Sequence, residues 1–387
     1  MKKQSLKKFK LGINASRVNS GGGIAYLVGF LKSIKKYSKF ISSIHLWCHP
    51  TLAISIKPNF FLNVHVPVKL SKSIFCKILW EKYDLPVEFK KFGCDILLNV
   101  DAGSFARVRP CVTVSQDMLS YEKGVSSLFG FGIQRLRIEI LKYVQDQSLR
   151  FADTSIFLTK YAFRTINTNN KINSYSIIPH GVNTIFKKKR YKLKNTNSLR
   201  CIYVSNLLPY KHHIEVIKAF SYLKKKGDIK VDLTIDSENL KNTKYEQKFY
   251  NELRIIDYNN KFISCIGNIP NSKLPQLIEK YDIFIFASSC ENMPITLIEA
   301  MAMGMPICCS DRGPMREILK DAGVYFNPQS PSSIASSISL LWNDLNLRIA
   351  LSKKALALSK EYSWDKCTKE TFSSLKLTLQ SHIKKNS

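Results

Sequence analysis

The sequence predicts an α/β protein of two domains, each built on a parallel sheet. Short apolar runs of β-forming residues alternate with segments of helical periodicity in both halves of the chain, as parallel sheets require. A length of 387 residues, 45% of them hydrophobic, fits two domains and supplies a sizeable core. The basic polar stretch "FKKKRYKLKNTNS" (residues 186–198) separates the two alternations and predicts a linker between them.

The first half begins with a strand at residues 9–14 and a glycine loop at Gly21–Gly23. Apolar residues then recur at helical spacing from Ile24 to Leu31, which predicts a helix after the loop. The amides of Gly22 and Gly23 could therefore approach a phosphate group, although a simple tight turn explains the glycines equally well. The other elements expected in this half are strands at residues 94–100, 111–117 and 154–159 and a helix at residues 131–152.

The second half repeats the alternation. Its expected strands lie at residues 200–206, 230–236, 261–267, 281–288 and 305–311, with helices at residues 213–226 and 273–281 between them. Each strand ends in polar or glycine-bearing sequence. In open α/β sheets ligands bind outside the carboxyl ends of the strands, so chemistry is expected at these ends.

The charge of the chain is strongly positive and uneven. Lys and Arg number 59 against 29 Asp and Glu, and residues 1–190 hold 31 of the basic residues and only 10 of the acidic ones. Such a field attracts nucleic acid, an anionic membrane surface or phosphorylated substrates. The alternative is a Lys-rich composition that merely decorates the surface.

The sequence offers no signal for export, membrane spanning or metal binding. The apolar run after the basic N-terminus is shorter than that of a signal peptide, and no run approaches the ~20 residues of a spanning helix. A cytoplasmic protein with reduced thiols is therefore expected, in which Cys308 and Cys309 are buried and not zinc ligands. The acidic residues lack ligand spacing, so we expect no metal and no cofactor.

Two carboxylates stand out in "FASSCENMPITLIEAMAMG" (residues 286–304). Pro294 suits a helix start and Gly304 its end, which places Glu291 in the preceding loop and Glu299 within the helix. The first-turn amides of that helix favour phosphate, and carboxylates accept hydrogen bonds from sugar hydroxyls. Alternatively, Glu291 is an N-terminal capping acid and Glu299 a solvated helix residue.

The run "SSCENMPITLIEAMAMGMPICCSDRGPMREIL" (residues 288–319) resembles the E-x7-E segment of the family 4 retaining glycosyltransferases. Similar segments of that family correspond to residues 19–31, 177–186, 203–220 and 362–372. The resemblance implies a GT-B fold, with two Rossmann-like domains facing a central cleft. It further implies an acceptor-binding domain at residues 1–187, a nucleotide-sugar-binding domain at 188–361 and a closing helix at 362–387 that crosses back.

The resemblance also implies roles for individual residues. Glu299 occupies the position that binds the ribose, and Glu291 the position that contacts the donor sugar. Backbone amides of Met293, Ile295 and Thr296 would face the sugar or the pyrophosphate. Lys211 would neutralise the pyrophosphate as the sugar leaves, unless it is one solvated lysine among many. Asp117 stands at its usual place in the family pattern, and Glu291, Lys211 and Asp117 are the expected catalytic residues.

Two positions depart from the family pattern. Asn206 stands where many members carry a second cation for the pyrophosphate, and Gln116 where many carry a histidine that contacts the donor sugar. We expect both to contribute to the nucleotide-sugar site. The arginines that could compensate for the missing cation are Arg107, Arg109, Arg312 and Arg316.

Together these features predict a retaining, metal-independent hexosyltransferase. It would move a sugar from a nucleotide-diphosphate sugar to a saccharide or lipid-linked acceptor in lipopolysaccharide, capsule or other surface polysaccharide synthesis. A non-catalytic sugar-nucleotide-binding protein and a basic nucleic-acid-binding protein are the alternatives, although no nucleic-acid-binding motif is found. Peripheral contact with an anionic membrane face is expected at residues 31–40 and 70–83, unless these are ordinary amphipathic helices with their lysines outward.

Overall fold

The computed structural model describes residues 8–18, 21–54, 56, 60–130, 132–172, 174–188, 198–225, 227, 229–235 and 243–386. The chain divides into two compact units. The first unit holds residues 1–121, 132–181 and 363–387, and the second unit holds residues 122–131 and 182–362. Most of the predicted linker, residues 189–197, lies outside the described residues.

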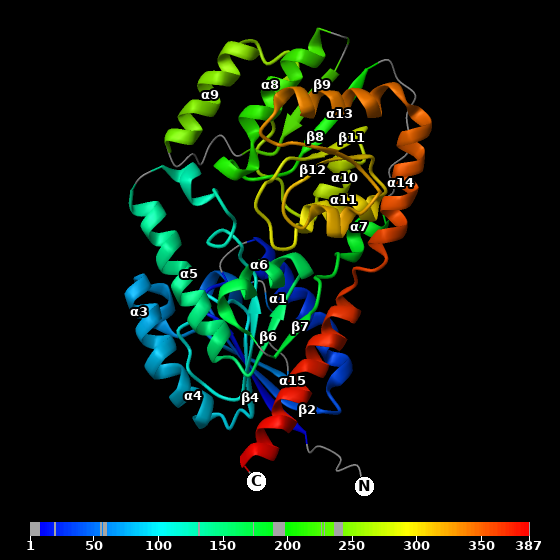
Figure 1. Cartoon of the computed structure of the whole chain (residues 1–387). Coiled ribbons are helices and arrows are strands. Elements are labelled where there is room, and N and C mark those ends of the chain that lie inside the picture. Colours follow the sequence, from blue (N-terminus) through cyan, green and yellow to red (C-terminus); the bar gives the residue numbers. More distant parts are fainter. Residues whose placement is uncertain are drawn as a thin grey trace. The chain divides into compact units, whose positions relative to one another are not determined.

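The first unit is built on a parallel sheet in the order β3-β2-β1-β4-β5-β6-β7 (Figure 1). Its strands are β1 (Phe9–Ala15), β2 (Ile41–Cys48), β3 (Leu62–His65), β4 (Ile96–Asn99), β5 (Cys111–Ser115), β6 (Thr154–Phe157) and β7 (Tyr175–Ile177). The chain runs outward from β1 to β3 and returns to β4 on the other side of β1. The carboxyl ends of β1 and β4 therefore flank the switch point of the sheet, where ligands of open α/β sheets bind.

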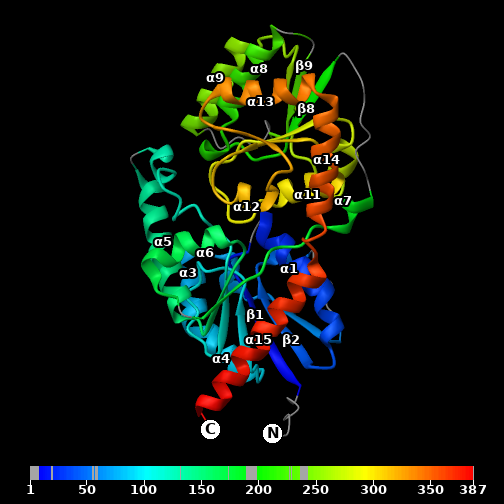
Figure 2. The ribbon, with the colours of Figure 1, turned by 45° about the vertical axis from the view of Figure 1, so that its right-hand side comes forward.

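Helices lie between these strands along the chain, and one further helix ends the chain. They are α1 (Gly21–Ile34), η1 (Lys35–Tyr37), α2 (Pro50–Ala53), η2 (Val68–Ser71), α3 (Ile74–Leu79), η3 (Trp80–Asp84), α4 (Leu85–Lys91), α5 (Ile133–Phe151), α6 (Lys160–Asn170) and α15 (Trp364–Asn386). The C-terminal α15 packs beside α1 (Figure 2). Gly29 permits this packing, because a Cβ atom there would lie 2.2 Å from the Trp364 ring. His180 is buried between the rings of Tyr26 and Trp364, which supports a structural role for it.

The second unit carries a parallel sheet in the order β10-β9-β8-β11-β12-β13. Its strands are β8 (Leu199–Tyr203), β9 (Ile229–Leu233), β10 (Ile263–Cys265), β11 (Ile283–Phe286), β12 (Ile307–Ser310) and β13 (Val324–Phe326). Its helices are η4 (Ser126–Phe129), α7 (Thr184–Lys188), η5 (Pro209–Lys211), α8 (His213–Lys224), α9 (Lys244–Ile256), α10 (Leu274–Ile278), α11 (Ile295–Met303), α12 (Met315–Leu319), α13 (Pro331–Asn343) and α14 (Leu345–Ser359). Buried Leu, Ile, Val and Phe side chains of β8, β9, β11 and α8 form its core.

The α/β class with two parallel sheets is confirmed, and each predicted strand and helix is found within a few residues of its expected bounds. The glycines form no loop before the helix: Gly21, with φ 59°, opens α1, so Gly22 and Gly23 lie in its first turn. Among the described residues, β2, β3, β7 and β13 were not predicted. The strands β3, β7 and β13 are short and lie at the edges of their sheets, so their sequence signal is weak. In β2, Ser and His residues interrupt the apolar pattern.

Candidate active site

The second unit brings Lys211 and Glu291 together. Lys211 ends η5 after β8, and Glu291 lies in the loop between β11 and α11. Because β8 and β11 are neighbours in the sheet, their carboxyl ends place the two side chains side by side, and Lys211 Nζ donates to Glu291 Oε1. Each side chain is 15% exposed, so the pair is shielded but open to a ligand. Lys211 therefore has a specific partner and is not one solvated lysine among many.

Hydrogen bonds hold the two loops that carry this pair. The Ser289 N–H donates to the Tyr210 carbonyl (2.9 Å), and His212 Nε2 and Ser289 Oγ share a hydrogen bond of 2.8 Å. The Tyr203 hydroxyl donates to the carbonyl of Lys211 (2.7 Å). His212 adopts φ 52°, a left-handed conformation that non-glycine residues seldom take, just before α8 begins. The sequence carried no signal for this anchoring role of His212 and Ser289.

Glu299 is buried inside the second unit. It lies on α11, is 3% exposed and accepts a hydrogen bond from Asn271 Nδ2 (3.0 Å). Burial raises the pKa of its carboxyl from 4.5 to about 7, while the bond from Asn271 acts in the opposite direction. The alternative of a solvated helix residue is therefore wrong. Asn271 follows β10 by several residues and was not singled out from the sequence.

The start of α11 offers an anion-binding position between the two glutamates. Pro294 is the N-cap residue and supplies no side-chain cap, and its carbonyl accepts the N–H groups of Leu297 and Ile298. The amides of Ile295 and Thr296 precede the first intrahelical bonds and point toward the loop of Glu291. Since the Glu291 carboxylate bonds to Lys211, Glu291 is not the capping acid of this helix. Met293 and Asn292 are buried in the same loop.

Asn206 and the candidate compensating arginines have separate surroundings. Asn206 is exposed in the loop after β8. In the same unit, Arg312 pairs with Asp311 (3.6 Å) and the Arg316 guanidinium lies 4.2 Å from the Tyr325 ring centroid. In the first unit, the guanidinium of Arg107 donates to the carbonyl of Ala106 and that of Arg109 to the carbonyl of Phe151. Arg107 and Arg109 thus have structural partners of their own.

The remaining predicted residues lie in the first unit. Gln116 and Asp117 follow β5, and Asp117 Oδ1 accepts the Leu119 N–H (2.8 Å). The Nε2 atom of Gln116 is buried without a hydrogen-bond partner among the described residues. Gly22 and Gly23 lie in the first turn of α1, which follows β1 of the same sheet. These positions all follow carboxyl ends of strands in the first sheet.

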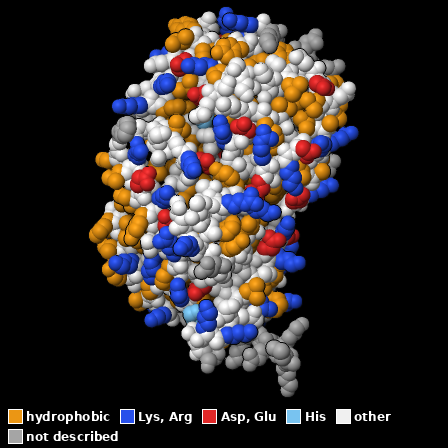
Figure 3. All heavy atoms as spheres, in the orientation of Figure 1, with side chains coloured by type: hydrophobic (Ala, Val, Ile, Leu, Met, Phe, Trp, Pro, Cys, Tyr) orange, Lys and Arg blue, Asp and Glu red, His pale blue; other side chains and the backbone are white. Residues whose placement is uncertain are grey.

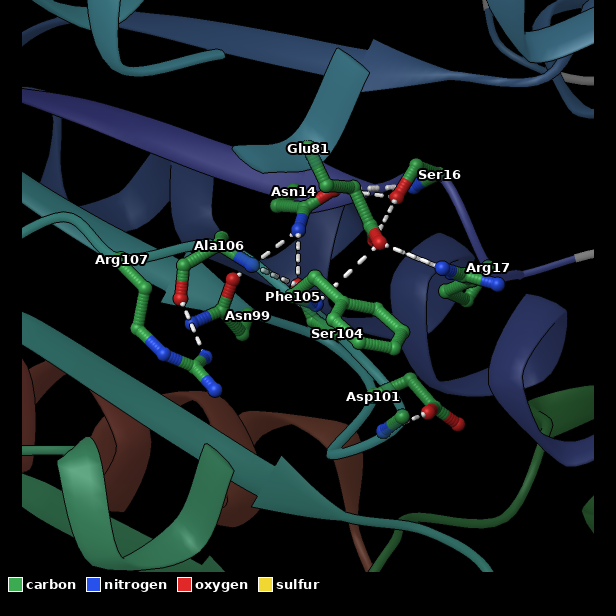
Figure 4. A network of polar contacts seen from close by, with 11 residues as sticks. Asn14, Ser16, Arg17, Glu81, Asn99, Asp101, Ser104, Phe105, Ala106 and Arg107 are labelled. Carbon is green, nitrogen blue, oxygen red and sulfur yellow. Dashed lines mark hydrogen bonds and ion pairs between the residues drawn. The ribbon is translucent and has the colours of Figure 1, made fainter. Parts of the chain in front are cut away.

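A buried carboxylate that sequence reasoning missed lies at the same edge (Figure 4). Glu81, in the π-helical turn η3, is fully buried. It accepts hydrogen bonds from Ser16 Oγ (2.6 Å), from Arg17 Nε (3.1 Å) and Nη2 (2.6 Å), and from the Phe105 N–H (3.3 Å). Glu81 thereby ties the residues after β1 to the loop after β4, at the switch point of the sheet.

The same loop is held by Asn14 and carries a further acid. Asn14 Nδ2 donates to Asn99 Oδ1 (3.1 Å) and to Ser104 Oγ (2.9 Å) (Figure 4). Asp101 accepts the N–H of Gly103. Burial raises the pKa of Asp101 to about 6, and the negative charge of Asp117 adds to this rise. The carboxyl of Asp101 thus lies close enough to the predicted Asp117 for the two charges to interact.

Within the described parts of the chain, no group of three or more His, Cys, Asp or Glu side chains could hold a metal ion. None of the described helices has the length and apolar character needed to cross a bilayer. All ten cysteines are described, and each is a free thiol.

Residues 184–357 match the family model described as glycosyl transferases group 1. This region holds Lys211, Glu291 and Glu299. Residues 184–357, most of the second unit, thus belong to the group 1 glycosyltransferases. The family predicted from the sequence is thereby confirmed.

Curated glycosyltransferases match the chain in part or nearly in full. The O-antigen chain mannosyltransferase B of Escherichia coli is 30% identical over 116 residues, which is 30% of each chain. An uncharacterized glycosyltransferase of Haemophilus influenzae is 23% identical over 372 residues, covering 93% of this chain and 98% of that protein. The first of these relatives is thus matched over less than a third of its length.

Solved protein structures share the fold. A glycosyltransferase from Rickettsia africae has a TM-score of 0.73 at 18% identity, covering 96% of this chain and 99% of its own. Anabaena Alr3699/HepE, solved in complex with UDP-glucose, has a TM-score of 0.71 at 16% identity, covering 95% and 100%. The predicted GT-B fold is confirmed by these similarities.

Proposed function

We propose that this group 1 glycosyltransferase is a retaining enzyme that transfers a hexose-type sugar from a nucleotide-diphosphate sugar to a saccharide or lipid-linked acceptor. The observation that carries the proposal is the arrangement in the second unit, where the Lys211–Glu291 pair, the start of α11 and Glu299 follow the carboxyl ends of the strands. This arrangement offers, in order, hydrogen-bond acceptors for a sugar, positive potential for a diphosphate and an acceptor for a ribose.

Each group has a defined part in the proposed reaction. An acceptor hydroxyl attacks the anomeric carbon as the bond from that carbon to the phosphate oxygen breaks, and the leaving phosphate takes the hydroxyl proton. Lys211 and the first amides of α11 stabilise the negative charge that develops on the departing diphosphate. Glu291 orients the sugar hydroxyls, and Glu299 holds the ribose through its carboxylate. No step requires a metal ion, because these groups supply the positive potential.

The names of similar proteins support a role in surface polysaccharide synthesis. The O-antigen mannosyltransferase of Escherichia coli and the lipopolysaccharide outer core galactosyltransferase WaaB both act on surface polysaccharides. By analogy, we place this enzyme in surface polysaccharide synthesis, in the cytoplasm and at the inner face of the plasma membrane. Since Alr3699/HepE was solved with UDP-glucose, UDP-sugars are the first donors to test.

The proposal is tested by donor binding followed by transfer. The protein is incubated with UDP-, GDP-, ADP- and dTDP-sugars, and thermal stabilisation is measured for each. One class of donor is expected to raise the unfolding temperature of the wild type, and Glu299→Ala is expected to abolish that rise. Glu361→Ala is the matched control, because Glu361 is an exposed acid of the same unit. Absence of stabilisation by every donor, or full stabilisation of Glu299→Ala, contradicts the assignment.

A second candidate function rests on Asn206 and Gln116. These residues replace a cation and a histidine of the family pattern, which favours a protein that binds sugar nucleotides without efficient transfer. Donor-induced stabilisation combined with neither transfer to membrane-extracted acceptors nor hydrolysis of the donor would favour this second function. Salt-sensitive binding to DNA without any response to sugar nucleotides would instead favour a nucleic-acid-binding protein.

A further inference from the structure

Helix α5 of the first unit has a second apolar face that points to solvent. Ile133, Leu136, Ile140 and Tyr143 recur at i, i+3, i+7 and i+10, which places them on one stripe of the helix, and they are 54% to 76% exposed. The face that packs on the unit consists of other residues, including Ile138 and Leu149, which are buried. An ordinary surface helix carries one apolar face, so the exposed stripe calls for a partner outside the unit.

The segment from α3 to α4 exposes further large apolar side chains. Ile74, Phe75, Tyr83 and Val87 are 57% to 66% exposed. Figures 1 and 2 both draw α3 and α5 on the same side of the first unit. In Figure 3, hydrophobic side chains gather there with Lys and Arg between them. We name the α5 stripe together with these four residues the apolar-basic surface.

The apolar-basic surface is positively charged because most of the acidic side chains near it bind partners within the first unit. Lys72, Lys82 and Lys90 are exposed in the α3–α4 segment, and Arg137 is exposed beside the α5 stripe. The acids of the α3–α4 segment have partners within the unit: Glu81 binds Arg17, Asp84 binds Lys69, and Glu88 accepts from Trp47 and Trp80. Only Glu139 of α5 is an exposed acid near the stripe. The surface thus offers cations around apolar side chains.

The other segment predicted to contact a membrane has a different structure. In residues 31–40 the apolar side chains of Leu31 and Ile34 are buried, and Tyr37 stacks on Phe372 of α15 with ring centroids 4.4 Å apart. The lysines of this segment point outward. For residues 31–40 the structure therefore favours the alternative of an ordinary packed helix. Residues 70–83 and α5 remain the candidates for membrane contact.

We propose that the first unit docks on an anionic membrane surface through the apolar-basic surface. Ile, Leu, Phe and Tyr side chains would enter the boundary between headgroups and acyl chains, while Lys and Arg would pair with lipid phosphates. A symmetric contact with a second copy is disfavoured, because it would bring like charges together, and the cores of protein interfaces are depleted in charged residues. The proposal rests on the proposed function in one respect: a lipid-linked acceptor would be met at such a surface.

The test uses the full chain and sedimentation with lipid vesicles. The wild type is expected to bind vesicles that contain phosphatidylglycerol and to bind pure phosphatidylcholine vesicles far more weakly. Added salt should release it, because the electrostatic part of the attraction is screened. The triple substitution Ile133→Ser, Leu136→Ser and Ile140→Ser is expected to weaken partition to the anionic vesicles at least about tenfold, since three exposed apolar side chains are lost. The charge reversal Lys72→Glu with Lys82→Glu is expected to weaken it as well.

The matched control lies in the second unit. Ile255 and Tyr258 are 81% and 82% exposed, so Ile255→Ser with Tyr258→Ser removes equally exposed apolar side chains elsewhere and should leave vesicle binding unchanged. Equal binding of the wild type and the α5 variant, or equal binding to neutral and anionic vesicles, overturns the proposal. A wild type that is dimeric by light scattering, with an α5 variant that is monomeric, would assign the surface to a second copy instead.

A second measurement separates this proposal from the proposed function. Donor-induced thermal stabilisation is measured in the same variants and is expected to equal that of the wild type, because the substituted residues lie outside the donor site. Loss of vesicle binding with normal donor response supports the docking surface alone. Vesicle binding by a wild type that responds to no donor contradicts the proposed function and leaves the docking surface supported. Equal unfolding temperatures without ligand establish that the variants fold.

Discussion

Two pairs of opposite charge, one in each unit, serve different purposes. In the second unit Lys211 and Glu291 are each 15% exposed. In the first unit Glu81 is fully buried, and three residues donate four hydrogen bonds to it. A partly open pair can exchange its partner for a substrate group, whereas a fully bonded buried carboxylate cannot do so without disrupting the fold.

The two pairs also differ in whether they lie within the region that matches the family model. The region that matches the group 1 model, residues 184–357, lies within the second unit and contains Lys211 and Glu291. Glu81 lies outside it. The matched region thus contains the proposed donor site, whereas Glu81 stabilises the sheet edge of the first unit. The substitutions below test that division.

The largest effect is expected from Glu81→Ala. Removing this carboxylate leaves the half-buried Arg17 without its partner and leaves the buried Ser16 hydroxyl and the Phe105 N–H without this acceptor, so the free energy of unfolding should fall by about 3–5 kcal/mol. Urea denaturation measures the loss, and hydrogen exchange should localise it to the first unit. Glu361→Ala, which breaks an exposed pair with Lys320, should change stability by less than about 1 kcal/mol. If both substitutions cost the same, Glu81 is not a structural carboxylate.

Lys211→Ala should separate function from stability. The transfer rate kcat is expected to fall by about 10²–10³, because a fixed charge beside the leaving diphosphate is lost. Stability should change little, since Glu291 is left partly exposed and can be hydrated. Lys280→Ala, at an exposed position of the same unit, should affect neither quantity. A Lys211→Ala enzyme that transfers sugar normally but unfolds easily would place this pair in the same class as Glu81.

The sequence predicts the second unit better than the first. The positions of Glu291 and Glu299 on either side of the start of α11 follow from local signals, namely a buried strand, Pro294 and Gly304. The partnership of Lys211 with Glu291 was not predicted, because β8 and β11 are neighbours in the sheet but are separated along the chain by β9 and β10. Asn271 could not be found in this way, since it reaches Glu299 from a loop with no periodic pattern.

Glu81 could not be predicted because its environment depends on distant segments. Its donors Ser16 and Phe105 are 65 and 24 residues away in the chain. The sequence "LSKSIFCKILWEKY" favoured a surface segment, but Glu81 lies on the π-helical turn η3 and is buried there. The exposed stripe of α5 was missed for a related reason: periodicity predicts a helix, but it does not show which of two apolar faces the sheet covers.

The smallest expected effect is a pH dependence of donor binding. It compares two acids with raised pKa values, Glu299 in the second unit and Asp101 in the first. Burial raises the pKa of Glu299 from 4.5 to about 7, so its carboxyl gains a proton as the pH falls below 7 and then accepts fewer hydrogen bonds from a ribose. Donor affinity should therefore weaken by about tenfold between pH 8 and pH 6, as expected for one titrating group.

Glu299→Gln should bind donor more weakly than the wild type at pH 8 and should lose this pH dependence, whereas Asp101→Asn should retain it, because Asp101 lies at the sheet edge of the other unit. Stability should change in the opposite direction. A carboxyl whose pKa is raised by folding stabilises the fold at pH values below 4.5, and this contribution is lost as the pH rises toward 7. Glu299→Gln should therefore unfold at a higher temperature than the wild type at pH 8. If Glu299→Gln is more stable but binds donor less well, the Glu299 carboxylate serves binding at a cost in stability. If donor binding by Glu299→Gln still depends on pH, another group is the one that titrates.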